Sequence, residues 1–228
     1  MKKNISLIVL LTVVMSAVCS CDSYLDRQPD DQLTSKNIFD KKTTTMRYLV
    51  NVYSYIPYEW SPEGSGDHSG IAITASDEAS CAYTGSRFFA LLNHNQLSPL
   101  STLTGYRYAV YRLLYQGISE ATYFMSKVAE CPQITPEEIE MWRGEARFLR
   151  AFYYTELLKW NGPVIWTGDA LADFSDPNVS KVDRSPWSTI VDWLCSEYDT
   201  AASELPETRS PYEVGRATKG SALAMKAR

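Results

Sequence analysis

The sequence predicts a mainly α-helical fold of tetratricopeptide-like helical pairs, an α–α superhelix interrupted by an irregular, loop-rich insertion. Apolar side chains recur every three or four residues in several stretches, which is the period of a helix with one buried face. Those stretches are bounded by capping residues, prolines and glycines, which are typical of helix ends. Between the first two helices lies a long segment without a persistent period, and its Gly-, Ser- and Pro-rich start indicates loops.

The N-terminus has the layout of a secretory signal peptide. Two lysines precede a 14-residue, mostly apolar run over 5–18, which is shorter than the roughly 20 helical residues that cross a bilayer. The run leads into Val18-Cys19-Ser20-Cys21, which resembles a bacterial lipobox with Cys21 as the lipidated cysteine. The alternative is an ordinary signal peptide with incidental cysteines. We expect cleavage after residues 1–20, with residues 21–41 forming a lipid anchor and tether.

An anchor at Cys21 would hold the protein on a membrane without spanning it. One acyl chain binds a membrane only marginally, and stable anchoring needs a second. A bacterial lipoprotein cysteine normally carries a diacylglycerol, usually with an amide-linked chain, and so meets that need. No later stretch approaches 18 uninterrupted apolar residues. We therefore expect the mature chain to fold in water, beside the membrane.

Charge and cysteine usage exclude several functional classes. Without residues 1–20 the chain has 20 basic and 27 acidic side chains, a net charge of −7, which argues against nucleic-acid or phosphate binding. Cys81, Cys131 and Cys195 are spaced by 50 and 64 residues, unlike metal ligands, so we expect structural thiols with at most one disulfide. Only two histidines are present, far apart. We expect no metal site and no cofactor.

The first predicted helix covers about 42–56 and ends at Pro57. Its apolar positions at helical spacing are Met46, Leu49, Val50, Tyr53 and Ile56. Residues 57–70 are predicted to form a loop, and 71–99 to form loops with short strands.

A helical hairpin is predicted over 105–159. The first helix spans about 105–129, and the second begins at Thr135-Pro136-Glu137-Glu138, where Thr135 caps, Pro136 takes the first helical position and Glu138 completes a capping box. The second helix runs to about Lys159, and Asn161-Gly162-Pro163 ends it with a left-handed cap residue followed by a proline. The short connection predicts antiparallel packing. Its inward face is predicted to hold Ile139, Trp142, Ala146, Leu149, Tyr153 and Leu157.

Two further helices complete the predicted helical domain over 42–228. Residues 164–166 suggest a short strand and 167–184 a surface excursion. A helix then spans about 185–205, with Trp187, Ile190, Val191, Leu194, Tyr198 and Ala202 inward. The last helix, opened by Gly215-Arg216-Ala217-Thr218, is rich in small residues and has no stop signal before Arg228. We therefore expect the sequence to be truncated in mid-helix.

Four stretches resemble the SusD/RagB family of outer-membrane nutrient-binding lipoproteins of Bacteroidetes. They are Cys21 with Tyr24-Leu25-Asp26 and Pro29, then Ser76-Asp77-Glu78, then 144–154 with Gly162-Pro163-Val164, and finally 215–228. The resemblance implies a surface-exposed, lipid-anchored protein that captures oligosaccharides, or peptides in some members. It also implies delivery of the ligand to a SusC-like TonB-dependent transporter, and no catalysis.

Sugar binding requires flat aromatic faces beside hydrogen-bonding groups, in loops where the aromatics are not needed for packing. Tyr58, Trp60, Tyr83, Arg87 and Asn93 meet these conditions and are the predicted ligand contacts.

Two other functions fit the sequence less well. A glycosidase needs two carboxylates facing each other across a cleft, and the neighbouring Asp77 and Glu78 point in different directions in any regular element. A pure tetratricopeptide scaffold that binds a protein helix would show regular 34-residue units, which the irregular 57–104 stretch contradicts.

Overall fold

The structure is a computed structural model, and it describes residues 35–57, 76, 104–171 and 182–228, without the side chains of 35, 36 and 104–109. The chain divides into two compact units, Met1–Ile38 and Phe39–Arg228. In the first unit only the start of helix α3 (Ser35–Phe39) is described. The helices discussed below belong to the second unit.

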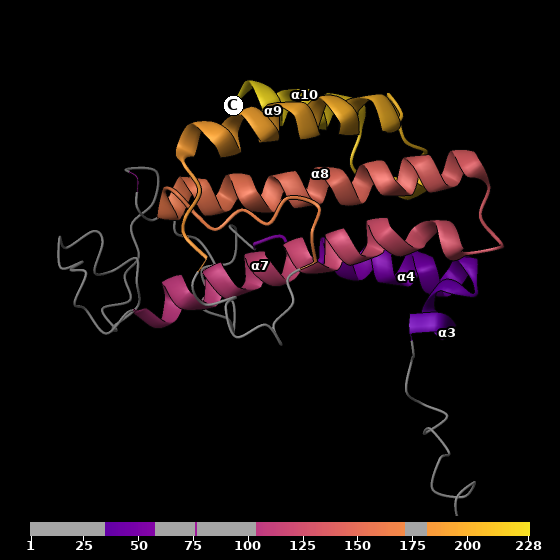
Figure 1. Cartoon of the computed structure of the whole chain (residues 1–228). Coiled ribbons are helices and arrows are strands. Elements are labelled where there is room, and N and C mark those ends of the chain that lie inside the picture. The colour runs from indigo at the N-terminus through magenta and orange to yellow at the C-terminus, as the bar shows by residue number, and fades with distance from the viewer. Residues whose placement is uncertain (1–34, 58–75, 77–103, 172–181) are drawn as a thin grey trace, which may run out of the picture. The chain divides into compact units, whose positions relative to one another are not determined.

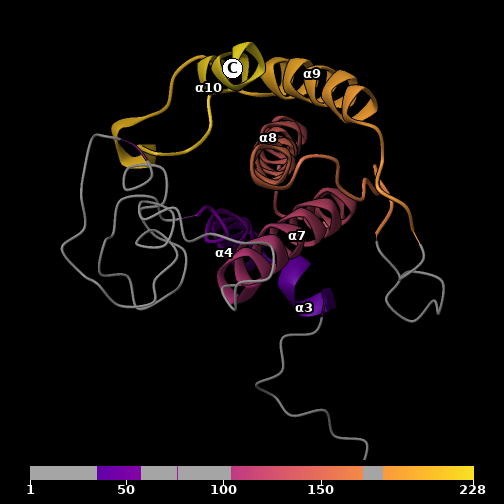
Figure 2. The ribbon, with the colours of Figure 1, turned by 90° about the vertical axis from the view of Figure 1, so that its left-hand side faces the viewer.

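The second unit is a stack of helices, as the sequence predicted. In Figure 1, α7 (Thr104–Lys127) and α8 (Pro136–Asn161) lie side by side and run in opposite directions. Figure 2 shows α8 end-on, between a layer of α4 (Lys42–Tyr53) and α7 and a layer of α9 (Trp187–Glu204) and α10 (Lys219–Ala227). Short 3₁₀ turns occupy Val128–Glu130 and Pro211–Glu213. None of the described residues forms a strand.

Helix α8 is the centre of the core because it is covered on opposite sides. Trp142, Leu149 and Tyr153 on its predicted inward face are at most 1% exposed. Further fully buried side chains come from the neighbouring helices: Leu49 and Val52 of α4, Leu114 and Phe124 of α7, and Ile190 of α9. A helix buried on more than one side needs small or apolar residues around most of its circumference, and most residues from Ala146 to Leu158 of α8 are small, apolar or aromatic.

The start and end of α8 follow the predicted capping signals, with one difference. The Thr135 side chain accepts from the backbone N–H of Glu138, and the Glu138 side chain accepts from the backbone N–H of Thr135, which confirms the capping box. Gly162 has the predicted positive φ of 67°, but its ψ of −142° lies outside the left-handed helical region. The following Pro163 explains this, because a proline disfavours helical ψ in the preceding residue.

Three positions predicted to face the core are exposed. Val50 and Ile56 of the first predicted helix are 59% and 40% exposed. Helix α4 instead buries Thr45, Leu49 and Val52 and ends at Tyr53. Trp187 is 50% exposed because it is the first residue of α9, where the helix has only begun to approach its neighbours.

The segment after α8 is extended but is not a strand. Tyr115 of α7 donates to the Ile165 carbonyl at 2.7 Å, and the backbone N–H of Ser185 donates to the Val164 carbonyl at 2.9 Å. The Arg184 guanidinium donates to the Pro163 carbonyl at 3.3 Å. These contacts replace the ladder that a strand would need. They also bring together the two ends of the predicted surface excursion.

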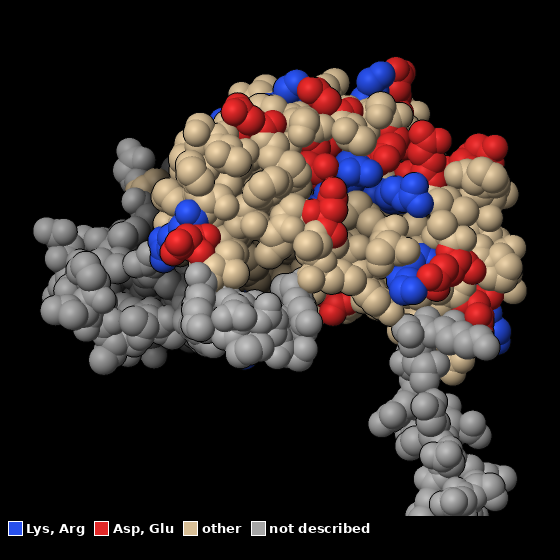
Figure 3. Space-filling model, viewed as in Figure 1, with Lys and Arg blue, Asp and Glu red and all other residues tan. Residues whose placement is uncertain are grey.

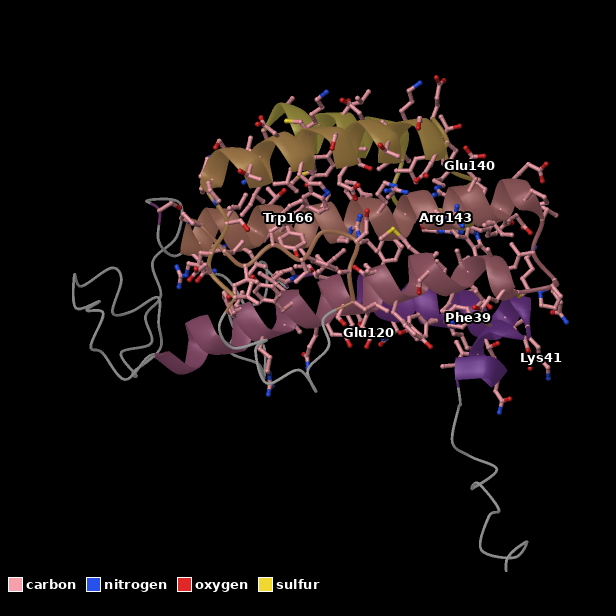
Figure 4. All side chains as sticks on the ribbon, in the orientation of Figure 1. Phe39, Lys41, Glu120, Glu140, Arg143 and Trp166 are labelled. Carbon is pink, nitrogen blue, oxygen red and sulfur yellow. The ribbon has the colours of Figure 1, made fainter. Side chains whose placement is uncertain are left out.

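A short helix that the sequence analysis did not predict places Phe39 in the core. Phe39, the last residue of α3, is 2% exposed. Its ring centroid lies 5.5 Å from that of Tyr48 and 6.1 Å from that of Phe124. Figure 4 shows Phe39 beside α4 and α7. The second unit therefore begins with an aromatic side chain packed against its first two long helices.

Candidate functional site

The predicted ligand contacts Tyr58, Trp60, Tyr83, Arg87 and Asn93 lie outside the described residues. The same holds for the predicted lipidation site Cys21 and for the neighbouring acids Asp77 and Glu78. The structure does describe the residues that directly precede these predicted contacts in the chain, namely the last turn of α4 and the residues up to Pro57.

A buried carboxylate, that of Glu145 in α8, lies beside the last turn of α4. Glu145 is 0% exposed. Arg216 donates to it through Nε at 2.9 Å and Nη2 at 2.5 Å, and Arg209 Nη2 lies 2.9 Å from Glu145 Oε1. Tyr53 of α4 donates its hydroxyl proton to Glu145 Oε2 at 2.7 Å. We call these four residues, Tyr53, Glu145, Arg209 and Arg216, the Glu145 hub.

The hub fixes the loop over 206–218, which connects α9 to α10. The Tyr53 hydroxyl accepts from the backbone N–H of Ala217 at 2.9 Å, and Arg209 donates to the Ala217 carbonyl through Nε at 3.0 Å and Nη2 at 2.8 Å. Arg216 also pairs with Glu213. The tip of this held loop projects into solvent, since Tyr212 is 99% and Val214 86% exposed.

Electrostatics within the hub favour the charged arginine. Burial lowers the pKa of Arg216, but the hydrogen bonds and charge of Glu145 raise it more, so its pKa lies above the ordinary value. Burial also raises the pKa of Tyr53, and the charge of Glu145 raises it further. Tyr53 is therefore a neutral donor at physiological pH, and the carboxylate that accepts from it also pairs with two arginines.

Two further contacts hold the end of α4. The Tyr153 hydroxyl of α8 donates to the Val52 carbonyl, which also accepts from the backbone N–H of Tyr55 at 3.5 Å. Gly117 allows α7 to lie close to Tyr153 and Tyr55, because a Cβ at position 117 would stand 2.7 Å from the Tyr153 ring and 2.9 Å from Tyr55 Cβ. The last turn of α4 thus contacts α7, α8 and the 206–218 loop.

A second charge network joins α8 to α9. Glu197 of α9 accepts from Arg150 Nη2 at 2.6 Å and from Arg147 Nη1 at 3.2 Å. Arg147 also donates to both carboxylate oxygens of Glu204, at 2.9 and 3.3 Å. Arg150 is 0% exposed and also pairs with Asp169. Each of these carboxylates is engaged by a guanidinium.

An aromatic cluster lies where α7, α8, α9 and the 162–170 segment meet. The Trp193 ring centroid is 5.2 Å from that of Tyr154 and 5.7 Å from that of Trp166, and the Arg150 guanidinium lies 5.3 Å from it. Figure 4 shows Trp166 between α8 and α7. These rings pack against one another, so the cluster fixes the 162–170 segment to the helices.

Charges of both signs are interspersed on the face of the protein shown in Figure 3. Figure 3 shows blue and red atoms lying next to one another across the described part of this face, without an extended basic patch. No three His, Cys, Asp or Glu side chains in the described ranges gather as metal ligands. Cys131 and Cys195 are free thiols, and Cys81 lies outside the described residues. Of the helices that the structure describes, none is both long and apolar enough to cross a membrane.

Sequence reasoning did not find the charge networks. Glu145, Arg147 and Arg150 lie in a stretch singled out for its family resemblance, but helical periodicity places charged residues on solvent-facing positions. The one available signal was composition, because three charged side chains interrupt a run of small and aromatic residues in 144–154. Apart from Asp169, which pairs with Arg150, their charged partners are at least 47 residues away in the sequence, which no local pattern reveals.

Comparison with known proteins agrees with this architecture. Residues 23–228 match a SusD-like family described as "Starch-binding associating with outer membrane". The chain belongs to this family. Among SusD-like relatives, SusD-like protein P38 of Formosa agariphila is 24% identical over 233 residues, which is 99% of this chain and 42% of that protein.

Solved SusD-like structures share the fold. A SusD-like protein from Bacteroides fragilis has a TM-score of 0.68 at 25% identity, over 89% of this chain and 37% of that one. A laminarin-binding SusD-like protein gives 0.67 at 21% identity, over 82% and 39%. Surface glycan-binding protein A from Bacteroides uniformis gives 0.64 at 18%, over 82% and 41%. The chain spans less than half the length of each of these relatives.

Proposed function

We propose that this SusD-like chain is part of a lipid-anchored, surface-exposed outer-membrane protein that binds an oligosaccharide and delivers it to a SusC-like TonB-dependent transporter. The observation that carries the proposal is the family match over residues 23–228, whose description combines starch binding with outer-membrane association. The helical stack around α8 agrees with that family's fold. The names of two structural relatives, one laminarin-binding and one glycan-binding, support a glycan as the ligand.

Binding without cleavage is part of the proposal. Glycoside hydrolysis requires one carboxyl group that donates a proton and a second carboxylate on the opposite side of the bond. Among the buried acids of the described residues, Glu145 and Glu197 are poorly suited to this, because each forms ion pairs with two arginines. A carboxylate whose oxygens are engaged by two guanidinium groups is not free to face a glycosidic bond.

The proposed ligand contacts are Tyr58, Trp60, Tyr83, Arg87 and Asn93. Aromatic rings stack on the apolar faces of sugars, and Arg and Asn side chains hydrogen-bond to the hydroxyl groups. An open surface encloses little of the ligand, and sugar hydroxyls lose water on binding, so modest affinity is expected.

Calorimetry of the full-length protein against a panel of glycans tests ligand class and contacts together. We expect binding of at least one glycan, unchanged glycan length, and weaker binding by Trp60→Ala and Tyr83→Ala. Tyr212→Ala is the matched control, because it removes an exposed aromatic ring outside the proposed contacts. A shortened glycan would identify an enzyme, and binding of peptides alone would show that the ligand class is wrong.

Membrane attachment through Cys21 is tested separately. Cys21→Ala should move the protein from the outer-membrane fraction to the soluble fraction and abolish incorporation of labelled fatty acid. A wild-type protein that takes up no label, together with unchanged retention of the variant, contradicts lipidation. Co-purification of a TonB-dependent transporter with the wild-type lipoprotein tests the proposed partner.

A further inference from the structure

One contact joins α4 to the start of α10 across a layer of the stack. The Tyr53 hydroxyl, at the end of α4, accepts from the backbone N–H of Ala217 at 2.9 Å. Ala217 directly precedes Thr218, the N-cap residue of α10. Helices α4 and α10 lie in layers on opposite sides of α8 (Figure 2), and α10 packs against α9. In a repeat-type stack each helical pair contacts only its neighbours, so this contact departs from the ordinary pattern.

The backbone just before α10 is held on both of its polar groups. Ala217 is 4% exposed. Its amide donates to Tyr53, and its carbonyl accepts from Arg209 at 2.8 and 3.0 Å. The next residue, Thr218, accepts from the backbone N–H of Ser221 at 3.3 Å and so caps α10. A buried amide without an acceptor costs about as much free energy as a lost hydrogen bond, so the position of this cap depends on the Tyr53 hydroxyl.

The remaining contacts of the Glu145 hub require three parts of the chain at once. Arg209 and Arg216 come from the 206–218 loop, Glu145 from α8 and Tyr53 from α4. The arginine side chains are 6% and 17% exposed, and that of Glu145 is 0% exposed. Loss of hydration offsets much of the attraction within such buried pairs. Directional, charge-assisted hydrogen bonds nevertheless fix one geometry, and this geometry exists only when α4, α8 and the loop are all in place.

We infer that the Glu145 hub is a conformational latch: the start of α10 is ordered only when α4 is packed on α8, so these two distant helices open and close together. Tyr53 is the positioning residue for this coupling, because it is the single α4 side chain in the hub and bonds both Glu145 and the Ala217 amide. Without such a contact, α4 could loosen while α10 stayed in place on α9. The latch does not depend on which ligand the protein binds.

Hydrogen exchange in the full-length protein tests the latch. Tyr53→Phe keeps the ring and removes only the hydroxyl, so exchange at the Ala217 amide and in the first turn of α10 should become about tenfold faster. Exchange in the middle of α8, around Leu149, should stay as in wild type. Tyr115→Phe is the matched control, because it removes a hydroxyl that donates to the Ile165 carbonyl at 2.7 Å, between α7 and the segment after α8. The control should leave exchange in α10 unchanged.

A second variant tests whether the packing of α4 itself affects α10. Leu49→Ala shortens a side chain of α4 that is buried and lies outside the hub, so it should loosen α4. With the latch intact, this change should also speed exchange in the first turn of α10. In the Tyr53→Phe background it should add nothing there, because the connection is already broken. Exchange in α10 is compared with exchange in α8 in each variant, which separates local opening from unfolding of the whole unit.

Several results would overturn the latch. If Tyr53→Phe exchanges like wild type in α10, the hydroxyl does not hold that helix. Equal effects of Tyr53→Phe and Tyr115→Phe would show a general loss of stability. If Leu49→Ala speeds exchange in α4 alone, or speeds exchange in α10 equally in both backgrounds, the hub does not couple the two helices.

Discussion

Gly144 of α8 lies so close to Glu204 of α9 that a Cβ at position 144 would stand 2.7 Å from Glu204 Cβ and 3.3 Å from its carbonyl carbon. The neighbouring atoms belong to the backbone and the root of a side chain, so they cannot move away without shifting the helix. The same contact brings Glu204 within reach of Arg147. Close approach of α8 and α9 at this glycine is therefore what permits their charge network.

Gly144→Ala should destabilise the fold. Overpacking a tight contact costs roughly 1–3 kcal/mol, which exceeds the gain in helix propensity of about 1 kcal/mol at most positions. We expect the free energy of unfolding to fall by about 1–2 kcal/mol in chemical denaturation. Gly220→Ala in α10 is the control, because a Cβ there meets only Thr218 Oγ1 at 3.8 Å. That variant should be slightly more stable than wild type, and equal losses at both glycines would contradict the close-contact argument.

Thr135→Ala should weaken the start of α8. The change removes the acceptor for the Glu138 amide and with it half of the capping box, at a cost of about 1 kcal/mol. Thr135→Ser preserves the hydroxyl and should lie near wild type. Urea midpoints of the three proteins measure the effect, and an alanine variant as stable as the serine variant would show that the cap contributes nothing.

Arg150→Met should be strongly destabilising. Arg150 is fully buried and donates to Glu197, and removal of one partner from a buried pair typically costs about 3–5 kcal/mol. Because Arg147 also reaches Glu197, we expect the lower end, about 3 kcal/mol. Lys226→Met breaks an exposed pair with Asp199 and should cost less than about 1 kcal/mol. Similar losses from both variants would show that burial does not decide these energies.

Acid should weaken the contact between α4 and α8. The hydrogen bond from Lys42 lowers the pKa of Glu138 below its ordinary value of 4.5. Folding therefore favours the ionised carboxylate, so this stabilisation is present above pH 4.5 and is lost as the pH falls through the lowered pKa. Lys42→Met should reduce the loss of stability between pH 7 and pH 3, by less than about 1 kcal/mol for so exposed a pair. Denaturant midpoints at the two pH values measure this, and an unchanged difference would exclude a contribution from Lys42.

Local signals predicted most of the helices because those signals act over a few residues. The capping box at Thr135 and the glycine at 162 depend on neighbours within four positions, and both are present. The prediction of the inward face of α8 was correct. So many side chains of this helix are buried that almost any apolar position on it faces a neighbouring helix. Trp187 was wrong for the opposite reason: a position at a helix end is buried only if another element covers it.

The Glu145 hub could not be predicted from the sequence because its partners come from distant segments. Tyr53 and Glu145 are 92 residues apart, and Tyr53 and Ala217 are 164 apart. Glu145 was also not among the residues predicted to face the core, whereas the structure buries it completely. The burial of Phe39 could not be predicted either, because α3 is only five residues long and shows no helical period.

The contacts that join the two ends of the excursion after α8 have a consequence for how the chain tolerates change. The Ser185 amide donates to the Val164 carbonyl, and Arg184 donates to the Pro163 carbonyl. The residues that follow α8 and the residues that precede α9 are therefore held together. The entropy of closing a loop grows only slowly, by about 0.6 kcal/mol for each doubling of its length. We expect changes in length between Leu171 and Val182 to leave α8 and α9 in register, because the contacts of Trp166 and Asp169 lie before that interval. A reporter domain inserted there should be tolerated.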